Sequence, residues 1–250
     1  MTIRTPGFDA LAMRTVFLLL AALLSAPAEP ATIAVGSIKR FGVVSVVADK
    51  FTRSYIGFTA FTNKVEEIDV TSWGIDAAYA DQLGKAAAGV LSAQYVAAPY
   101  SPDDFSKISQ TNWRGAPNWS SIEAAVKTYC GANELDALLV ISKDRGTMPG
   151  TTIARVPMGI QGGGYGGHLG LSAAINVYDC ATGRMHQTEL LRVAKPGQLV
   201  WFPQVEISRD LMTHPLSEMD DKARDETKSK LLSLPGPGWD QTLRRMVRTP

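Results

Sequence analysis

The residues with the clearest potential for chemistry lie in one glycine-rich run, GIQGGGYGGHLG, at positions 159–170. Such runs can hold a phosphate, because glycine lets backbone N–H groups approach a ligand closely. Gly162 and Gly167 have the spacing of a Walker loop, but His168 and Leu169 stand where that loop needs lysine and serine or threonine. A dinucleotide-binding loop precedes a helix, whereas the residues after this run alternate with period two, which is typical of a strand. The run therefore predicts a β-hairpin connection, not a phosphate site.

Two side chains could still give this connection a binding role. Tyr165 and His168 are the only residues with side chains between positions 162 and 168, so we treat them as candidates for a contact surface. The alternative is a flexible hairpin tip or a bulged edge with no role in binding. Trp113 and Trp119, in a proline- and glycine-containing segment, are further contact candidates. Tryptophans at such places either stack on a ligand or cover a small core.

The two cysteines, Cys130 and Cys180, are the only ones in the chain. An even pair in a chain that enters an oxidising compartment is most simply a disulfide. The bond would close a loop of 50 residues, which stabilises a fold by roughly 3–4 kcal/mol in the chain-entropy model. A nucleophilic cysteine is the alternative, but no histidine that could activate it lies nearby in the sequence.

Other catalytic and metal-binding patterns are missing from the sequence. The histidines His168, His186 and His214 are too far apart for a zinc-ligand pair, so we expect no metal and no cofactor. No hydrolase elbow, zinc-protease or serine–lysine motif occurs. The adjacent carboxylates, such as Glu66 and Glu67, indicate a solvated surface. Catalysis is therefore not the favoured function, although a hydrolase with a site assembled in space stays an alternative.

The amino terminus predicts export. Residues 16–24 form a short apolar run that follows Arg4 and Arg14 and precedes an Ala-x-Ala site ending at Ala28. This is the pattern of a secretory signal peptide over residues 1–28, and it places the mature chain in the periplasm or outside the cell. The chain has 25 basic and 24 acidic residues, and loss of Arg4, Arg14 and Asp9 would leave equal numbers. A neutral chain argues against a nucleic-acid partner, and no later apolar stretch is long enough for stable membrane insertion.

The rest of the chain predicts a mixture of strands and helices. The β-branched apolar runs at 41–48 and 137–142 indicate buried strands, and residues 54–62 are expected to neighbour the first of them. Residues 63–69 are polar and acidic, and no strand is predicted there. Helical spacing of apolar residues predicts helices over 75–90, 122–131, 216–234 and 239–247. Further strands are expected at 95–99, 151–160, 169–179, 184–193 and 199–207, the last at a sheet edge because of Pro203.

This order of elements resembles a known family of envelope proteins. A strand FGVVSVV, a helix, a strand YVAAP, a second helix, then ALLVIS and a hairpin ending VYDCATGR are similar to the amino-terminal α/β domain of TolB-like and CsgG-like bacterial envelope proteins. The resemblance would cover residues 38–248. The chain lacks the propeller repeats of full-length TolB and the lipidation cysteine of CsgG-like lipoproteins. The resemblance implies an envelope location and association with another envelope protein, and it assigns no site residue.

We therefore expect a single α/β (α+β) domain over residues 38–248, a two-layer sandwich with a mixed sheet and about four helices. The favoured function is an exported, non-catalytic binding or assembly protein. The alternatives are the hydrolase and a receptor for a small ligand. The receptor would need a pocket of several hundred Å³ lined by tryptophans, with the segment 100–119 as its lid.

Overall fold

The computed structural model describes residues 38–57, 63–106, 108, 119–144, 146–147, 155–163, 166–193, 202–208, 211–212 and 215–248. The expected signal peptide, Trp113, Tyr165 and His214 lie outside these residues, and so does the side chain of Trp119. The expected fold class is confirmed, since two mixed sheets of five strands each combine with the helices. The strands are thus divided between two sheets, where the sequence predicts one.

The first sheet has a parallel centre. Its order is β4 (Gln94–Val96), β1 (Arg40–Ser45), β5 (Ala137–Lys143), β8 (Ala173–Asp179) and β9 (Met185–Leu190). The strand β1 pairs in parallel with both β4 and β5, whereas β8 runs antiparallel to β5 and β9. The apolar runs predicted as buried strands are β1 and β5, so the most hydrophobic segments form the middle of the sheet.

The second sheet contains the glycine-rich run. Its order is β10 (Gln204–Ile207), β7 (Gly166–Leu171), β6 (Met158–Gly163), β2 (Lys50–Ile56) and β3 (Lys64–Asp69). The chain passes from this sheet to the first one at Ser172, between β7 and β8. The pairing expected between the strands at 41–48 and 54–62 is wrong, because β1 and β2 lie in different sheets.

The acidic segment at 63–69 contains a strand, β3, that the sequence did not predict. It is an edge strand paired with β2 alone. Its charged side chains are matched across the pair, Glu67 with Lys50 at 2.9 Å and Glu66 with Arg53 at 2.6 Å. Ion pairs between neighbouring strands can thus support an edge strand that has little apolar surface.

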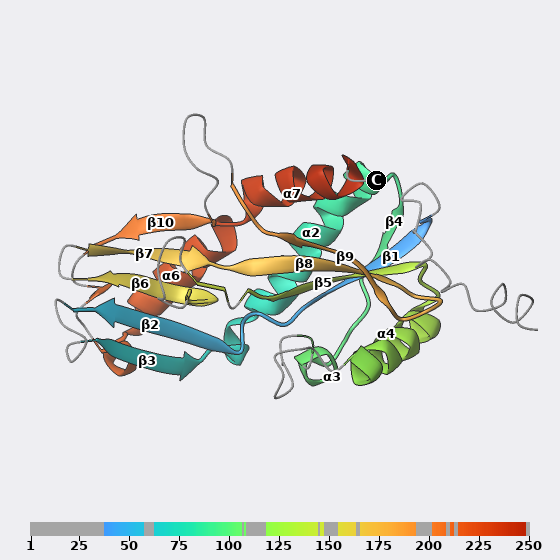
Figure 1. Ribbon diagram of the computed structural model, residues 1–250. Coiled ribbons are helices and arrows are strands. Elements are labelled where there is room, and N and C mark those ends of the chain that lie inside the picture. The colour runs from blue at the N-terminus through green and yellow to red at the C-terminus, as the bar shows by residue number, and fades with distance from the viewer. Residues whose placement is uncertain are drawn as a thin grey trace, which may run out of the picture. The chain divides into compact units, whose positions relative to one another are not determined.

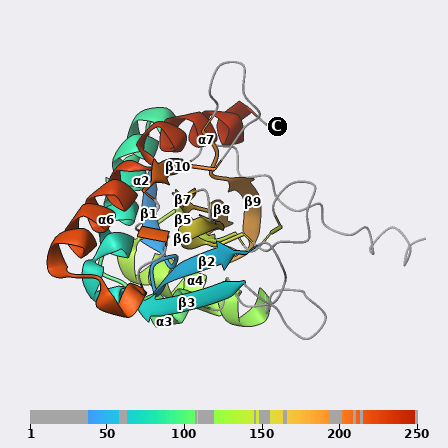
Figure 2. The ribbon, with the colours of Figure 1, turned by 90° about the vertical axis from the view of Figure 1, so that its left-hand side faces the viewer.

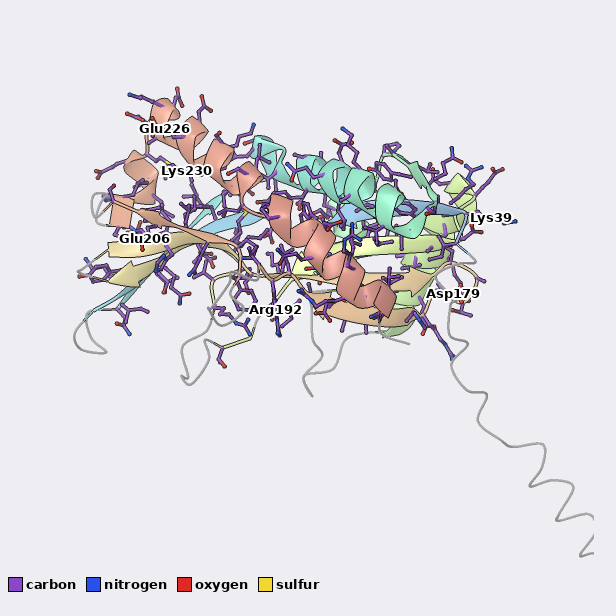
Figure 3. The ribbon with its side chains drawn as sticks, turned by 90° about the horizontal axis from the view of Figure 1, so that it is seen from above. Lys39, Asp179, Arg192, Glu206, Glu226 and Lys230 are labelled. Carbon is purple, nitrogen blue, oxygen red and sulfur yellow. A yellow bond between two sulfur atoms is a disulfide. The ribbon has the colours of Figure 1, made fainter. Side chains whose placement is uncertain are left out.

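The helices lie on both faces of the first sheet. The helices α2 (Ile75–Leu91), α6 (Asp221–Ser233) and α7 (Gly236–Arg248) lie on one side of the strands (Figures 1 and 3). They cover a core to which both sheets contribute, with Phe41 from β1, Phe51 from β2 and Leu169 from β7. The helices α3 (Pro102–Ser106) and α4 (Trp119–Asn133) lie below the other face of the first sheet (Figure 1).

A second, smaller core lies under α4. Ile122 and Val126 of the helix pack there against Val44, Leu138 and Val140. Figure 2 shows α2 and α6 on the outer side of the strands, with the second sheet seen from its end. The alternation of Val43 and Val44 between the two cores shows how one strand serves both faces.

The predicted disulfide is present. Cys130, at the end of α4, is bonded to Cys180, which follows β8, and their Cα atoms are 5.5 Å apart. The bond joins the helix to the β8–β9 turn beside the smaller core. In the part of the chain that the structure describes, no helix has the length and apolar character needed to cross a membrane.

Candidate functional site

A large hollow lies at the carboxyl ends of β1 and β4. It has a volume of about 550 Å³, and we refer to it as the β1–β4 cleft. It is lined by the end of β1 and the residues after it, the first half of α2, the residues after β4, and α3. Pockets for small ligands commonly have volumes of 300–1,000 Å³, so the cleft could hold a small organic molecule.

The topology of the first sheet explains why a cleft forms there. The connection from β1 to β4 runs through α2 on one face, and the connection from β4 to β5 runs through α4 on the other face. With the order β4–β1–β5, the helices diverge from a parallel core at the carboxyl ends of its strands. In open α/β sheets, ligands bind in the crevice that such a divergence leaves.

Asp76, in the first turn of α2, fixes the inner wall of the cleft. Its carboxylate accepts hydrogen bonds from the Ser45 hydroxyl at 2.6 Å and from the backbone N–H groups of Val47 at 3.0 Å and Ala48 at 3.2 Å. Burial raises the pKa of Asp76, while these three donors act in the opposite direction. The carboxylate therefore ties the chain after β1 to the start of α2 and turns it toward the second sheet.

Two tyrosines form much of the remaining wall. The Tyr100 hydroxyl donates to the Ser45 carbonyl and accepts from the Ser45 N–H, both at 3.0 Å. The Tyr95 hydroxyl reaches the Ala80 carbonyl at 3.5 Å. Burial raises the pKa of both phenols. Because both hydroxyl groups are bonded to the protein, these tyrosines have mainly ring surface left for a ligand.

The charged residues that line the cleft, within the described ranges, are the carboxylates Asp49, Asp76, Asp81 and Asp103. Asp49 forms an ion pair with Lys143, and Asp81 pairs with Lys85 at 2.6 Å. Neither lysine lines the cleft. Within the described residues, the carboxylate of Asp103 has no ion-pair partner. The cleft is therefore a negatively charged site with aromatic and aliphatic walls.

Among the contact candidates from the sequence, His168 alone has a described side chain, and it does not line this cleft. His168 is exposed on β7 and lines a separate hollow of about 80 Å³ on the second sheet. Trp119 is the first residue of α4, and Trp113 and Tyr165 lie outside the described residues. The grouping of the four candidates therefore stays a prediction, and no tryptophan is among the described residues that line the cleft.

The small hollow beside His168 has a well-ordered wall. Arg155 pairs with Asp144 at 2.8 Å, and its guanidinium carbon lies 4.2 Å from the centre of the Phe202 ring. Asp144 also accepts a hydrogen bond from the Ser172 hydroxyl at 3.0 Å. These contacts fix the chain at Ser172, where it passes from one sheet to the other. Their role is therefore structural.

The glycine-rich run is strand on both sides of residues 164–165, which lie outside the described part. Its residues form the paired strands β6 and β7, with Gly159 opposite Gly170 and Gly162 opposite Gly167. A Cβ atom on Gly159 would lie 1.9 Å from the Thr52 carbonyl oxygen, and one on Gly162 would lie 2.4 Å from the backbone of β7. The predicted hairpin is confirmed by the pairing of β6 with β7, and Gly159 and Gly162 are needed for the close approach of strands.

The described residues contain no assembled catalytic group of the kind that the hydrolase alternative needs. His168 and His186 make no hydrogen bond or ion pair with another described residue, and His214 lies outside the described part. Ser45 and Asp76 form a serine–carboxylate pair, but no histidine lines their cleft. No group of three or more histidine, cysteine or acidic residues within the described ranges could hold a metal ion.

Sequence reasoning missed the cleft because its walls come from three separate segments, 43–49, 71–81 and 95–106. None of the three contains a recognised motif. The one available signal was Asp76, a carboxylate placed just after Gly74 at the start of a strongly apolar helix. Comparison with known proteins adds no assignment: no family model and no curated protein matches this chain.

Proposed function

We propose that this chain is an exported, non-catalytic binding protein and that a small ligand occupies the β1–β4 cleft. The observation that carries the proposal is the position of a cleft of about 550 Å³ at the carboxyl ends of the parallel strands. Its wall is held rigidly by the bonds of Asp76 and Tyr100 to the β1 segment. A site built on fixed elements loses little freedom when a ligand binds.

Export is part of the proposal for two reasons. The first 28 residues have the composition of a signal peptide. The cysteines are joined, as is usual for proteins that mature in an oxidising compartment. An envelope location also agrees with the resemblance to the TolB-like and CsgG-like domains.

A small ligand is favoured over a protein partner because the described surface has no large apolar patch. The exposed large apolar side chains among the described residues are Val65, Val205 and Val247, which lie on β3, β10 and α7. The first two lie on strands at opposite edges of the second sheet. Single apolar residues spread in this way are normal on a surface and do not mark an interface.

The experiment compares two alanine-to-tryptophan variants. Ala77 is exposed on α2 and lines the cleft, so Ala77→Trp places a large ring in it. Ala124 is equally exposed on α4 and does not line the cleft, which makes Ala124→Trp the matched control. Each mature protein is dialysed against a small-molecule extract of the native envelope, and the retained molecules are identified by mass spectrometry.

We expect the wild type and Ala124→Trp to retain the same molecules and Ala77→Trp to lose them. Circular dichroism and thermal unfolding of each variant check that the fold is kept. Equal retention by all three proteins, or no retention by the wild type, would overturn the proposal.

A further inference from the structure

We infer that the β1–β4 cleft selects small organic cations, such as amines that carry an aromatic or aliphatic group. This inference rests on the proposed function, since it names the ligand class of the same site. The cleft volume and its ring surfaces provide the space and the apolar contact. The charges of the lining then decide which molecules of that size bind.

The charge balance of the lining is one-sided. Among the described residues, four aspartates line the cleft and no lysine, arginine or histidine does. Lys143 and Lys85 neutralise two of these aspartates from outside the lining. Asp76 and Asp103 remain without a basic partner among the described residues. A carboxylate ligand would meet this negative field without a cation to pair with it, whereas an ammonium group would be attracted.

The tyrosine rings also favour a cationic ligand. Their hydroxyl groups are bonded to Ser45 and Ala80, so the parts of the rings that line the cleft offer aromatic surface to a ligand. Part of that ring surface is already used inside the protein, because Tyr95 stacks on Phe41 and Tyr100 packs edge-on against Phe105. An ammonium group is attracted to the face of such a ring when it lies within about 6 Å of the centre. The apolar walls, formed mainly by alanine, valine and proline, can then hold the hydrocarbon part of the same molecule.

The amino terminus of α2 favours an anionic ligand instead. It reaches the cleft, since Gly74 and Ala77 also line it. A helix amino terminus carries a partial positive charge of about half a unit, which attracts anions. Asp76 already lies in that first turn and compensates this partial charge. After this compensation, the negative charge of Asp103 remains in the described lining and favours a cation.

Three compounds that share a benzene ring and differ in charge test the inference. These are 2-phenylethylamine, 2-phenylethanol and phenylacetate, titrated into the mature full chain and followed by ligand-observed NMR and calorimetry. We expect the amine to bind about tenfold more tightly than phenylacetate at low salt, with a smaller difference as the salt concentration rises.

Neighbouring aspartates provide a matched pair of variants. Asp103 and Asp104 are both exposed in the first turn of α3, but Asp103 alone lines the cleft. We expect Asp103→Asn to weaken amine binding about threefold to fivefold, while Asp104→Asn has little effect.

The outcomes separate the inference from the proposed function. Binding of the alcohol or phenylacetate as tight as that of the amine, abolished by Ala77→Trp, would overturn the cation selection and leave the cleft as a binding site. Binding unaffected by Ala77→Trp would overturn the proposed function itself. Failure of the amine to bind at millimolar concentration, or equal effects of Asp103→Asn and Asp104→Asn, would contradict the inference.

Discussion

At the scale of single residues, the structure shows that two adjacent carboxylates differ in the bonds they make and hence in their contribution to stability. Glu66 and Glu67 looked alike in the sequence, as a pair on a solvated surface. Glu66 bonds Arg53, whose side chain is 6% exposed, and also accepts the Leu216 N–H at 2.9 Å. This N–H, followed by Arg53, lowers the pKa of Glu66. Glu67 bonds only the exposed Lys50.

Replacing Glu66 should therefore destabilise the protein much more than replacing Glu67. Glu66→Ala leaves a buried guanidinium and a backbone N–H without their acceptor, and we expect a loss of roughly 2 kcal/mol in the free energy of unfolding. Glu67→Ala should change the stability little, because exposed ion pairs contribute little. Urea unfolding of both variants measures the difference, and equal losses would contradict this view of the pair.

Asp76 should titrate above the ordinary pKa of an aspartate, because burial raises it. Ser45→Ala removes a donor to the charged carboxylate and should raise the pKa of Asp76 further. A group with a raised folded pKa stabilises the fold fully below its unfolded pKa of 3.8, and this contribution is lost as the pH rises through the folded value. A pH titration of the Asp76 carboxyl ¹³C resonance gives its pKa in the folded wild type and in the folded Ser45→Ala variant. A Ser45→Ala variant with a lower Asp76 pKa would contradict the assigned hydrogen bond.

At the scale of elements, the glycine-rich run contributes to the paired strands β6 and β7, and this predicts which of its glycines the fold requires. Gly159→Ala would place a Cβ atom 1.9 Å from the Thr52 oxygen at a backbone φ of +147°, whereas the nearest atom to a Cβ on Gly170 is 3.5 Å away. We expect Gly159→Ala to cost more than about 3 kcal/mol and Gly170→Ala less than about 1 kcal/mol. Chemical unfolding measures both. Similar losses of stability for the two variants would show that the close approach of β2 and β6 does not require glycine at position 159.

The elements also show what the sequence could predict. The strands β1 and β5 and the helix α2 were predicted because their apolar residues have a clear local pattern. The strand β3 was missed because ion pairs with β2, not apolar side chains, hold it at the edge. The segment between β1 and β2, which lie in different sheets, is hydrogen-bonded to Asp76, a residue far along the chain from it. Local periodicity carries no information about such a contact.

At the scale of the whole molecule, one large core joins both sheets, and the disulfide ties α4 to the smaller core. A variant with both Cys130→Ala and Cys180→Ala should unfold in one transition, with a loss of roughly 3–4 kcal/mol from the greater entropy of the unfolded chain. Calorimetry compares the variant with the oxidised wild type. Two free thiols in the exported protein, or an unchanged unfolding temperature, would contradict the structural role of the bond.

The central claim is that the β1–β4 cleft is the ligand site, and NMR chemical-shift mapping tests it most directly. Uniformly ¹⁵N-labelled mature protein is titrated with 2-phenylethylamine, and the changes in amide shifts are mapped onto the structure. The account predicts that the changes concentrate at residues 74–81 and 97–103, which line the cleft. Changes concentrated at residues 159–170 of the second sheet, or none in the cleft, would contradict it.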